Sequence, residues 1–189
     1  KSPHTMKCPI LAALLILTLA TMVPVARADD LTAANAISAK PVFPTPIIWV
    51  GIEPPTTSES QDLMRAVSLF ETNGSKAGFA ALDDFASRNP SSAWTASVNL
   101  HLGDYYRSIG RYSKAAEMWT SAWQLTKDGK DAKCRDVAVS ASTSRLRLLQ
   151  SLGRLEEMES LLRECRQRGL DKTSKARLYQ SAQESLETM

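Results

Sequence analysis

Histidine and cysteine are scarce in this chain of 189 residues, which has 2 histidines and 3 cysteines. His101 has neither a cysteine nor a second histidine at the spacing of a metal site, so we expect no bound zinc. The motifs of serine hydrolases, phosphate loops and dinucleotide-binding folds are also missing. The acidic pairs Asp83-Asp84 and Glu156-Glu157 are adjacent in sequence, and adjacent side chains on a helix point about 100° apart. These absences predict a protein that is not an enzyme and has no cofactor.

A long apolar run is missing everywhere except near the beginning of the chain. There, Lys7 is followed by an apolar stretch over residues 10–20, and Ala26-Arg27-Ala28 places small residues where signal peptidase cleaves. We predict a signal peptide over residues 6–28, and therefore an exported protein that is periplasmic, at the cell surface or secreted. The alternative is an uncleaved anchor, but the stretch is short for a membrane span of about 20 residues. After cleavage we expect no stable membrane insertion.

An excess of one charge is also lacking once this first segment is set aside. The full chain has 23 Lys and Arg against 20 Asp and Glu, a net charge of +3. Lys1, Lys7 and Arg27 all precede the predicted cleavage site, so 20 residues of each sign follow it. Nucleic acid normally binds to a surface rich in Lys and Arg. The balanced charge therefore predicts no nucleic-acid partner.

Proline is almost absent from the second part of the chain, where Pro90 is the last one. Five prolines lie instead between residues 41 and 55. Proline removes a backbone donor and is excluded from helix interiors. We therefore predict an extended, Pro-rich linker over residues 29–58, with one apolar anchor at Ile47–Val50 that pairs as a short strand or packs onto helices. A helical domain is predicted over residues 59–189.

Apolar residues recur at helical spacing after residue 60. Asn73-Gly74 interrupts the first stretch, and Gly110 and Gly153 interrupt the later ones. The pattern predicts an all-α fold of about three stacked helical hairpins and a seventh, C-terminal helix, with no strand pattern. The helices expected after the first hairpin cover residues 95–109, 113–127, 136–152, 155–168 and 173–188.

The central hairpin carries a specific order of small and large residues. This order consists of Leu102, Gly103, Tyr106, the turn at Gly110, Ala115, Trp119 and Ala122. Small residues let two helices approach closely, and large ones fill the remaining space. The order resembles one tetratricopeptide (TPR) repeat, a helical hairpin that stacks on its neighbours. The next hairpin matches less well, because Leu146 and Met158 replace small residues. The alternative is an irregular helical bundle with one TPR-like hairpin.

Three stretches of the chain carry a second resemblance. Residues 83–94, 102–115 and 152–162 are together similar to the N-terminal helical region of exported bacterial YD-repeat (Rhs-like) proteins. Some of those proteins carry a cysteine-peptidase-like domain further along. The resemblance extends over residues 60–189 and implies export and a role as a front module. It leaves open whether this chain is a fragment of a longer protein.

The TPR resemblance also implies a binding surface. In TPR proteins the first helix of each hairpin lines a concave face, which places Asp104 and Arg107 of the central hairpin and Arg147 and Gln150 of the next one on that face. The two arginines can hold a carboxylate by bidentate hydrogen bonds, and ordinary solvent exposure is the alternative for each.

We therefore expect a scaffold that binds a peptide or protein segment through this face. One alternative is a front module whose groove packs against its own downstream chain. Another is the accessory domain of a larger enzyme or toxin-like protein whose catalytic part is absent from this chain.

Cys134 and Cys165 both follow the predicted cleavage site. Export leads to an oxidising compartment, in which disulfides persist. Cys134 precedes one predicted helix and Cys165 ends its antiparallel partner, so a disulfide between them is possible. The alternative is two independent cysteines, with Cys165 packed as a small apolar residue.

Overall fold

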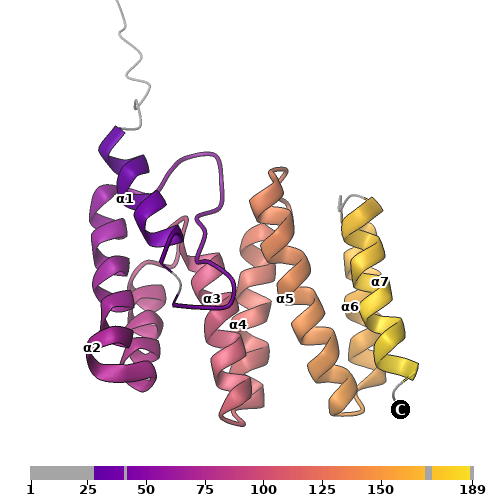
Figure 1. Cartoon of the computed structure of the whole chain (residues 1–189). Helices are drawn as coiled ribbons and strands as arrows, with labels where there is room; N and C mark the ends of the chain where they lie inside the picture. The colour runs from indigo at the N-terminus through magenta and orange to yellow at the C-terminus, as the bar shows by residue number, and fades with distance from the viewer. Residues whose placement is uncertain (1–27, 41, 169–171, 188–189) are drawn as a thin grey trace, which may run out of the picture.

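The structure is a computed structural model that describes residues 28–40, 42–168 and 172–187. The predicted signal peptide over residues 6–28 lies outside these ranges except for Ala28. Within them the chain forms helices and no strand, so the predicted all-α class is confirmed. No helix in the described part is both long and apolar enough to cross a bilayer. The helices are α1 (Ala28–Ser38), α2 (Thr57–Arg88), α3 (Thr95–Ser108), α4 (Tyr112–Thr126), α5 (Ala132–Ser151), α6 (Leu155–Gln167) and α7 (Lys172–Glu187), as Figure 1 shows.

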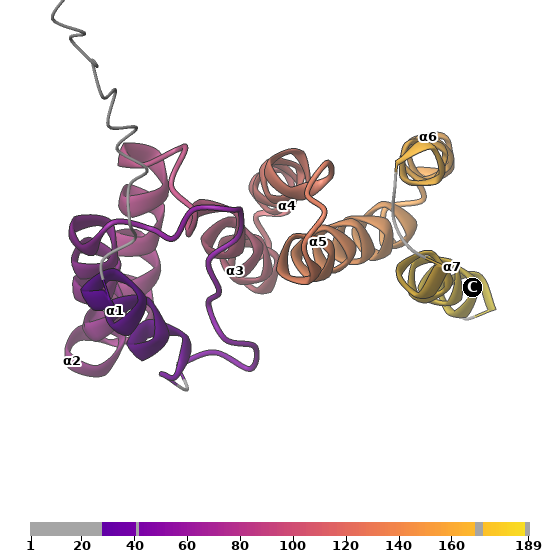
Figure 2. The same cartoon turned by 90° about the horizontal axis from the view of Figure 1, so that it is seen from above.

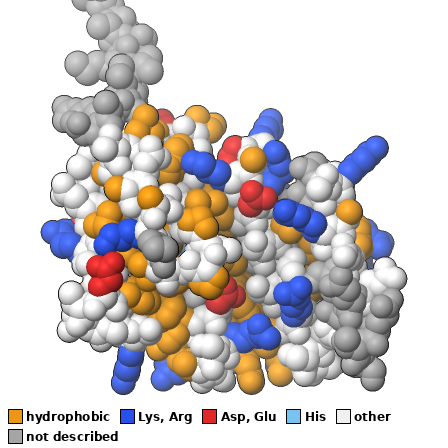
Figure 3. Space-filling model, in the orientation of Figure 1, with side chains coloured by type: hydrophobic (Ala, Val, Ile, Leu, Met, Phe, Trp, Pro, Cys, Tyr) orange, Lys and Arg blue, Asp and Glu red, His pale blue; other side chains and the backbone are white. Residues whose placement is uncertain are grey.

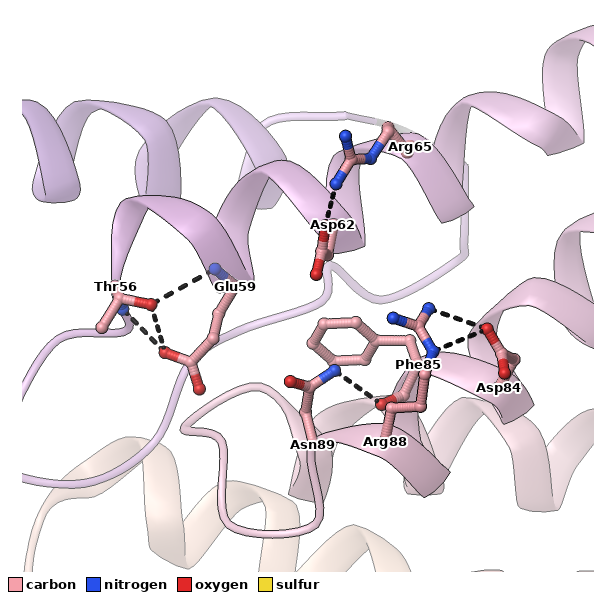
Figure 4. Close-up of polar contacts among 8 residues, drawn as sticks. All are labelled: Thr56, Glu59, Asp62, Arg65, Asp84, Phe85, Arg88 and Asn89. Carbon is pink, nitrogen blue, oxygen red and sulfur yellow. Dashed lines mark hydrogen bonds and ion pairs between the residues drawn. The ribbon is translucent and has the colours of Figure 1, made fainter.

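The first predicted hairpin is α2, which reverses direction at Gly74. Gly74 has a φ of 81°, a left-handed conformation that glycine adopts without strain. The two legs run side by side, with the ring centroids of Phe70 and Phe79 4.9 Å apart. The first leg begins with a capping box, in which the Thr56 hydroxyl accepts from the Glu59 N–H and the Glu59 carboxylate accepts from the Thr56 N–H (Figure 4).

Exposed ion pairs lie on the outer surface of both legs of α2. Arg65 pairs with Asp62 on the first leg, and Arg88 pairs with Asp84 over 2.7 Å on the second (Figure 4). Exposed pairs of this kind contribute at most about 1 kcal/mol each. The stability of α2 therefore comes mainly from its inward side chains. Those that are fully buried are Leu63, Val67, Leu82 and Phe85.

The next two hairpins, α3–α4 and α5–α6, turn in the same way. Gly110 and Gly153 have φ angles of 74° and 66°. The residues that follow them, Arg111 and Arg154, each donate a backbone N–H to the carbonyl five residues back, over 2.8 and 2.9 Å. This is the Schellman arrangement, which ends a helix at a left-handed glycine. The turns thus lie at both predicted glycines, and they make the two hairpins equivalent structural units.

Close packing between α3 and α4 depends on the residues that predicted this hairpin. A Cβ at position 103 would lie 2.3 Å from Trp119 Nε1, so only glycine fits there. Trp119 is fully buried, as are Ala115, Ala122 and Trp123 of α4. The small residues therefore mark the places where the two helices approach each other, and the tryptophans fill the space around those places.

The hairpins stack in two layers. Figure 2 shows α3, α5 and α7 in one layer and α4 and α6 in the other. Helix α5 packs against α3, α4, α6 and α7, so it joins the central hairpin to the C-terminal part of the array. The first helices of the α3–α4 and α5–α6 hairpins therefore share one face of the molecule with α7.

The prediction of an extended linker over residues 29–58 is wrong for its first part. Residues 28–38 form α1, which packs against α2 and buries Ala34 and Ile37. The physical reason is that these residues contain no proline, since the first proline of the predicted linker is Pro41. Residues 42–56 are non-helical, and the anchor residues Ile47 and Val50 are buried against the helices rather than paired in a strand.

Candidate functional site

Helices α3, α5 and α7 share one side of the molecule, which we call the groove face. Helix α1 and the segment after it lie on the same side of the array (Figure 2). It is the face on which the sequence analysis places the binding residues. Side chains that line its hollows include Ser97 and Leu100 of α3, Val137, Ser140 and Arg147 of α5, and Arg177 of α7.

Residues 42–50, which we call the N-terminal segment, cover the α3 part of the groove face. The Phe43 ring stacks on the His101 imidazole with centroids 4.6 Å apart, and it meets Phe70 edge-on at 5.0 Å. Phe79 lies 5.8 Å from Phe43 and stacks on Tyr105 of α3 at 4.0 Å. Aromatic pairs of this geometry add about 0.5–1.5 kcal/mol beyond burial. The cluster therefore fixes the segment between α2 and α3.

Backbone groups of the N-terminal segment are bound near the beginning of α3. The Ile48 N–H donates to Ser97 Oγ over 3.1 Å. The Val50 N–H donates to the Ala93 carbonyl over 2.9 Å. Buried backbone donors are stable only when they are paired, and these two bonds satisfy donors where the segment crosses the helix.

Further contacts tie the N-terminal segment to α1 and to α5. The Ser38 hydroxyl of α1 donates to the Ile47 carbonyl over 2.9 Å. At the other end, Lys133 Nζ of α5 lies 3.6 Å from the ring centroid of Trp49, a cation–π contact. The groove face thus holds a non-helical stretch of chain with a hydroxyl, an aromatic cluster and a cation.

His101 lies beneath the N-terminal segment and has a structural role there. Its side chain is buried, and burial lowers its pKa to about 4, although a hydrogen bond with the backbone of Pro46 acts in the opposite direction. The Nε2 atom has no hydrogen-bond partner among the described residues. The imidazole is therefore neutral near pH 7, and it serves as a flat surface for Phe43.

Asp104 and Arg107 lie on the exposed half of α3 beyond the N-terminal segment. Burial raises the pKa of Asp104, and the nearby Trp119 indole N–H and Arg107 guanidinium partly oppose the rise. Trp119 Nε1 nevertheless makes no hydrogen bond of standard geometry within the described part of the chain. Asp104 therefore lies near the Trp119 indole without a hydrogen bond to it, and its negative charge partly offsets that of Arg107.

Arg147 lines a hollow of about 360 Å³ between α5 and α7, where Arg177 of α7 is also present. The hydroxyl side chains of Thr143 and Ser144 line the same hollow. Gln150, three residues further along α5, is half-buried and is not part of its lining. The structure therefore combines Arg147 with Arg177 rather than with the predicted Arg107. The sequence carried no signal for Arg177, because α7 lacks the motif that located the other positions.

A second hollow of about 400 Å³ lies next to the first and has more apolar walls. Pro46 and Ile48 of the N-terminal segment form one wall, and Leu100 and Val137 form the other. Ser140 lines both hollows, so they are adjacent on the groove face. Figure 3 shows basic side chains gathered over α5 and α7, whereas hydrophobic ones are more frequent over the N-terminal half.

The structure does not contain the possible disulfide between Cys134 and Cys165. Both residues are buried free thiols. Cys165 lies near Ser142 and Arg145, two or more turns further along α5 than Cys134. Helices α5 and α6 are joined at the other end of the hairpin, and the register of their packing keeps the sulfurs apart. Burial raises the pKa of the Cys134 thiol to about 11, which also leaves it unreactive.

No family model, no curated protein and no solved structure matches the chain.

Proposed function

We propose that the protein is an exported, TPR-like scaffold that binds a peptide or protein segment through its groove face. The observation that carries this proposal is the position of the N-terminal segment, which the chain itself places on that face. Ile48 is held there by a side-chain hydroxyl, Phe43 by an aromatic cluster and Trp49 by a cation. These are the means by which helical scaffolds hold a non-helical chain.

The remainder of the groove face has room for a separate partner. One hollow of about 360 Å³ lies between α5 and α7, and the adjacent one of about 400 Å³ is lined by the N-terminal segment, α3 and α5. Small ligands and side chains bind in hollows of this size. Their lining combines apolar side chains with hydroxyls and arginines, which are the groups that bind both the side chains and the backbone of a peptide.

A second candidate function is an architectural one, in which the groove face serves the chain's own longer polypeptide. The contact between α3 and the N-terminal segment favours it, since the face already binds part of its own chain. In this case the protein is a front module or the accessory domain of a larger enzyme or toxin-like protein. Peptides from outside the chain then bind only weakly.

Selection of short random peptides by display on the purified protein tests the first function. We expect selected peptides to lose binding when Ser140→Trp fills the junction of the two hollows. Ser160→Trp on α6, which is exposed on the other layer, is the matched control and should leave binding unchanged. Peptides that bind Ser140→Trp as well as the original protein would show that the groove face is not the binding surface.

A further inference from the structure

We propose that the open half of the groove face selects an extended peptide in which an apolar side chain lies next to an acidic group. The acidic group binds between Arg147 and Arg177, and the apolar side chain enters the hollow between Ile48 and Val137. The inference rests on the proposed peptide-binding function and names the class of ligand for it.

The first argument is the state of the two arginines. Within the described residues Arg147 makes no ion pair, although it lines a hollow. Arg177 contacts Asp136 at 3.6 Å, but both side chains are more than half exposed. Such a pair is weak, so the Arg177 guanidinium retains donors for another carboxylate. Guanidinium groups bind carboxylates through paired hydrogen bonds.

The second argument is the balance of charge around the hollows. Lys133, Arg147 and Arg177 are the cationic side chains in their lining, and Asp136 is the one acidic side chain that the structure describes there. This excess of positive charge contrasts with the equal numbers of basic and acidic residues that follow the predicted cleavage site. An acidic partner group therefore complements the site, and a basic one is repelled.

The third argument is the adjacency of the apolar hollow. Leu100 and Val137, which are both buried, line it together with Ile48. Ser140 separates it from the arginines, so one ligand reaches both hollows. A peptide fits this arrangement because successive side chains of an extended chain supply an apolar group and a carboxylate, while Thr143 and Ser144 bind its backbone.

Fluorescence polarisation with labelled synthetic peptides tests the inference. The probes are Gly-Ser peptides that contain one Leu and one Glu at varied spacing, with Gln or Lys in place of Glu as matched peptides. We expect the best Glu peptide to bind about tenfold tighter than its Gln form, as a charged hydrogen bond predicts. Arg147→Met and Arg177→Met should each remove this preference, whereas Arg163→Met on the exposed surface of α6 should retain it.

The outcomes separate the inference from the proposed function. Equal binding of Glu and Gln peptides, with loss of both in Ser140→Trp, would overturn the acidic preference and leave the peptide function intact. If none of the Leu/Glu peptides binds while display-selected peptides still bind at Ser140, the acidic preference is likewise overturned and the peptide function is intact. Absence of binding in both experiments overturns both proposals. Decanoate, a fatty acid that shares the carboxylate and the apolar chain, should not displace the Glu peptide, and displacement would assign the site to lipids.

Discussion

The close packing of α3 on α4 depends on Gly103, which has no side chain. Alanine is the better helix former by about 1 kcal/mol, so an exposed glycine in a helix is usually improved by it. Here the added Cβ would lie 2.3 Å from Nε1 of Trp119, a fully buried ring enclosed by the core. The steric cost therefore exceeds the gain in helix propensity.

We expect Gly103→Ala to lower the free energy of unfolding by about 1–3 kcal/mol, as overpacked cores do. Urea denaturation followed by circular dichroism measures the change. Arg107→Ala, which introduces the same residue on the exposed side of α3, is the matched control and should change stability by less than about 0.5 kcal/mol. A neutral or stabilising Gly103→Ala would contradict the close contact.

His101 makes the stability of the fold depend on pH. Burial lowers its pKa from 6.5 to about 4 in the folded chain. Between these two values His101 binds a proton in the unfolded chain but not in the folded one. The contribution of His101 to stability is therefore fully present above pH 6.5 and is lost as the pH falls towards 4. The loss is about 3 kcal/mol when the pH reaches the folded pKa.

We expect His101→Phe, which keeps a ring beneath Phe43, to lose stability less steeply with acid than the original protein. Urea unfolding at about pH 7 and about pH 4.5 gives the change in unfolding free energy with pH for each protein. Subtracting one change from the other removes the contribution of the carboxylates that both proteins share. Parallel slopes would show that His101 is protonated equally in the folded and unfolded chains.

At the scale of the element, local signals predicted the hairpins well. Glycines with left-handed φ angles end α3 and α5, and these turns depend only on neighbouring residues. Helix α5 begins four residues earlier than predicted, because Asp131 caps it by accepting from the Cys134 N–H over 2.8 Å. Asp131, five residues before the predicted start at residue 136, was the signal that could have located the beginning of this helix.

The contacts of the candidate site could not be predicted in the same way. Ile48 and Ser97 are 49 residues apart in the chain, and no periodic pattern connects them. Phe43 and His101 are likewise far apart in the chain, and their rings meet only in the folded structure. Arg147 was identified because its hairpin has a recognisable turn, whereas Arg177 lies on a helix without such a reference point.

The two Schellman turns give a prediction for the hairpins. A Cβ at Gly153 meets no atom within 4 Å, so substitution there costs only backbone strain. We expect Gly153→Ala to lower the unfolding free energy by about 1–2 kcal/mol. Asn tolerates the left-handed conformation, so Gly153→Asn should cost less than Gly153→Ala in urea denaturation. Equal stability of both variants and the original protein would argue against the left-handed turn.

At the scale of the whole molecule, the N-terminal segment links the α2 hairpin to the stacked hairpins that follow. It contacts α2 through Phe70, α3 through Ser97 and α5 through Lys133. The segment therefore forms part of the folded array, and it adds to the direct contacts between α2 and α3, such as the stack of Phe79 on Tyr105.

Phe43→Ala should loosen this segment. We expect the amide protons of Ile48 and Val50 to exchange faster with solvent, since their acceptors Ser97 and Ala93 remain in place only while the segment is docked. Hydrogen exchange followed by mass spectrometry measures the effect, and the peptides of α6 serve as the internal reference. Ile52→Ala, at a fully exposed position, should change nothing. Unchanged exchange in Phe43→Ala would show that the aromatic cluster does not hold the segment.

Because the N-terminal segment is tethered to α2, it occupies the α3 part of the groove face as an intramolecular ligand. Its effective concentration there is on the order of millimolar. A separate peptide displaces the N-terminal segment from the α3 part only if it binds there tightly enough to compete with a ligand at this local concentration. Within the described residues, no tethered chain covers Arg147 and Arg177. If the proposed peptide function holds, a peptide partner first meets a vacant position between α5 and α7.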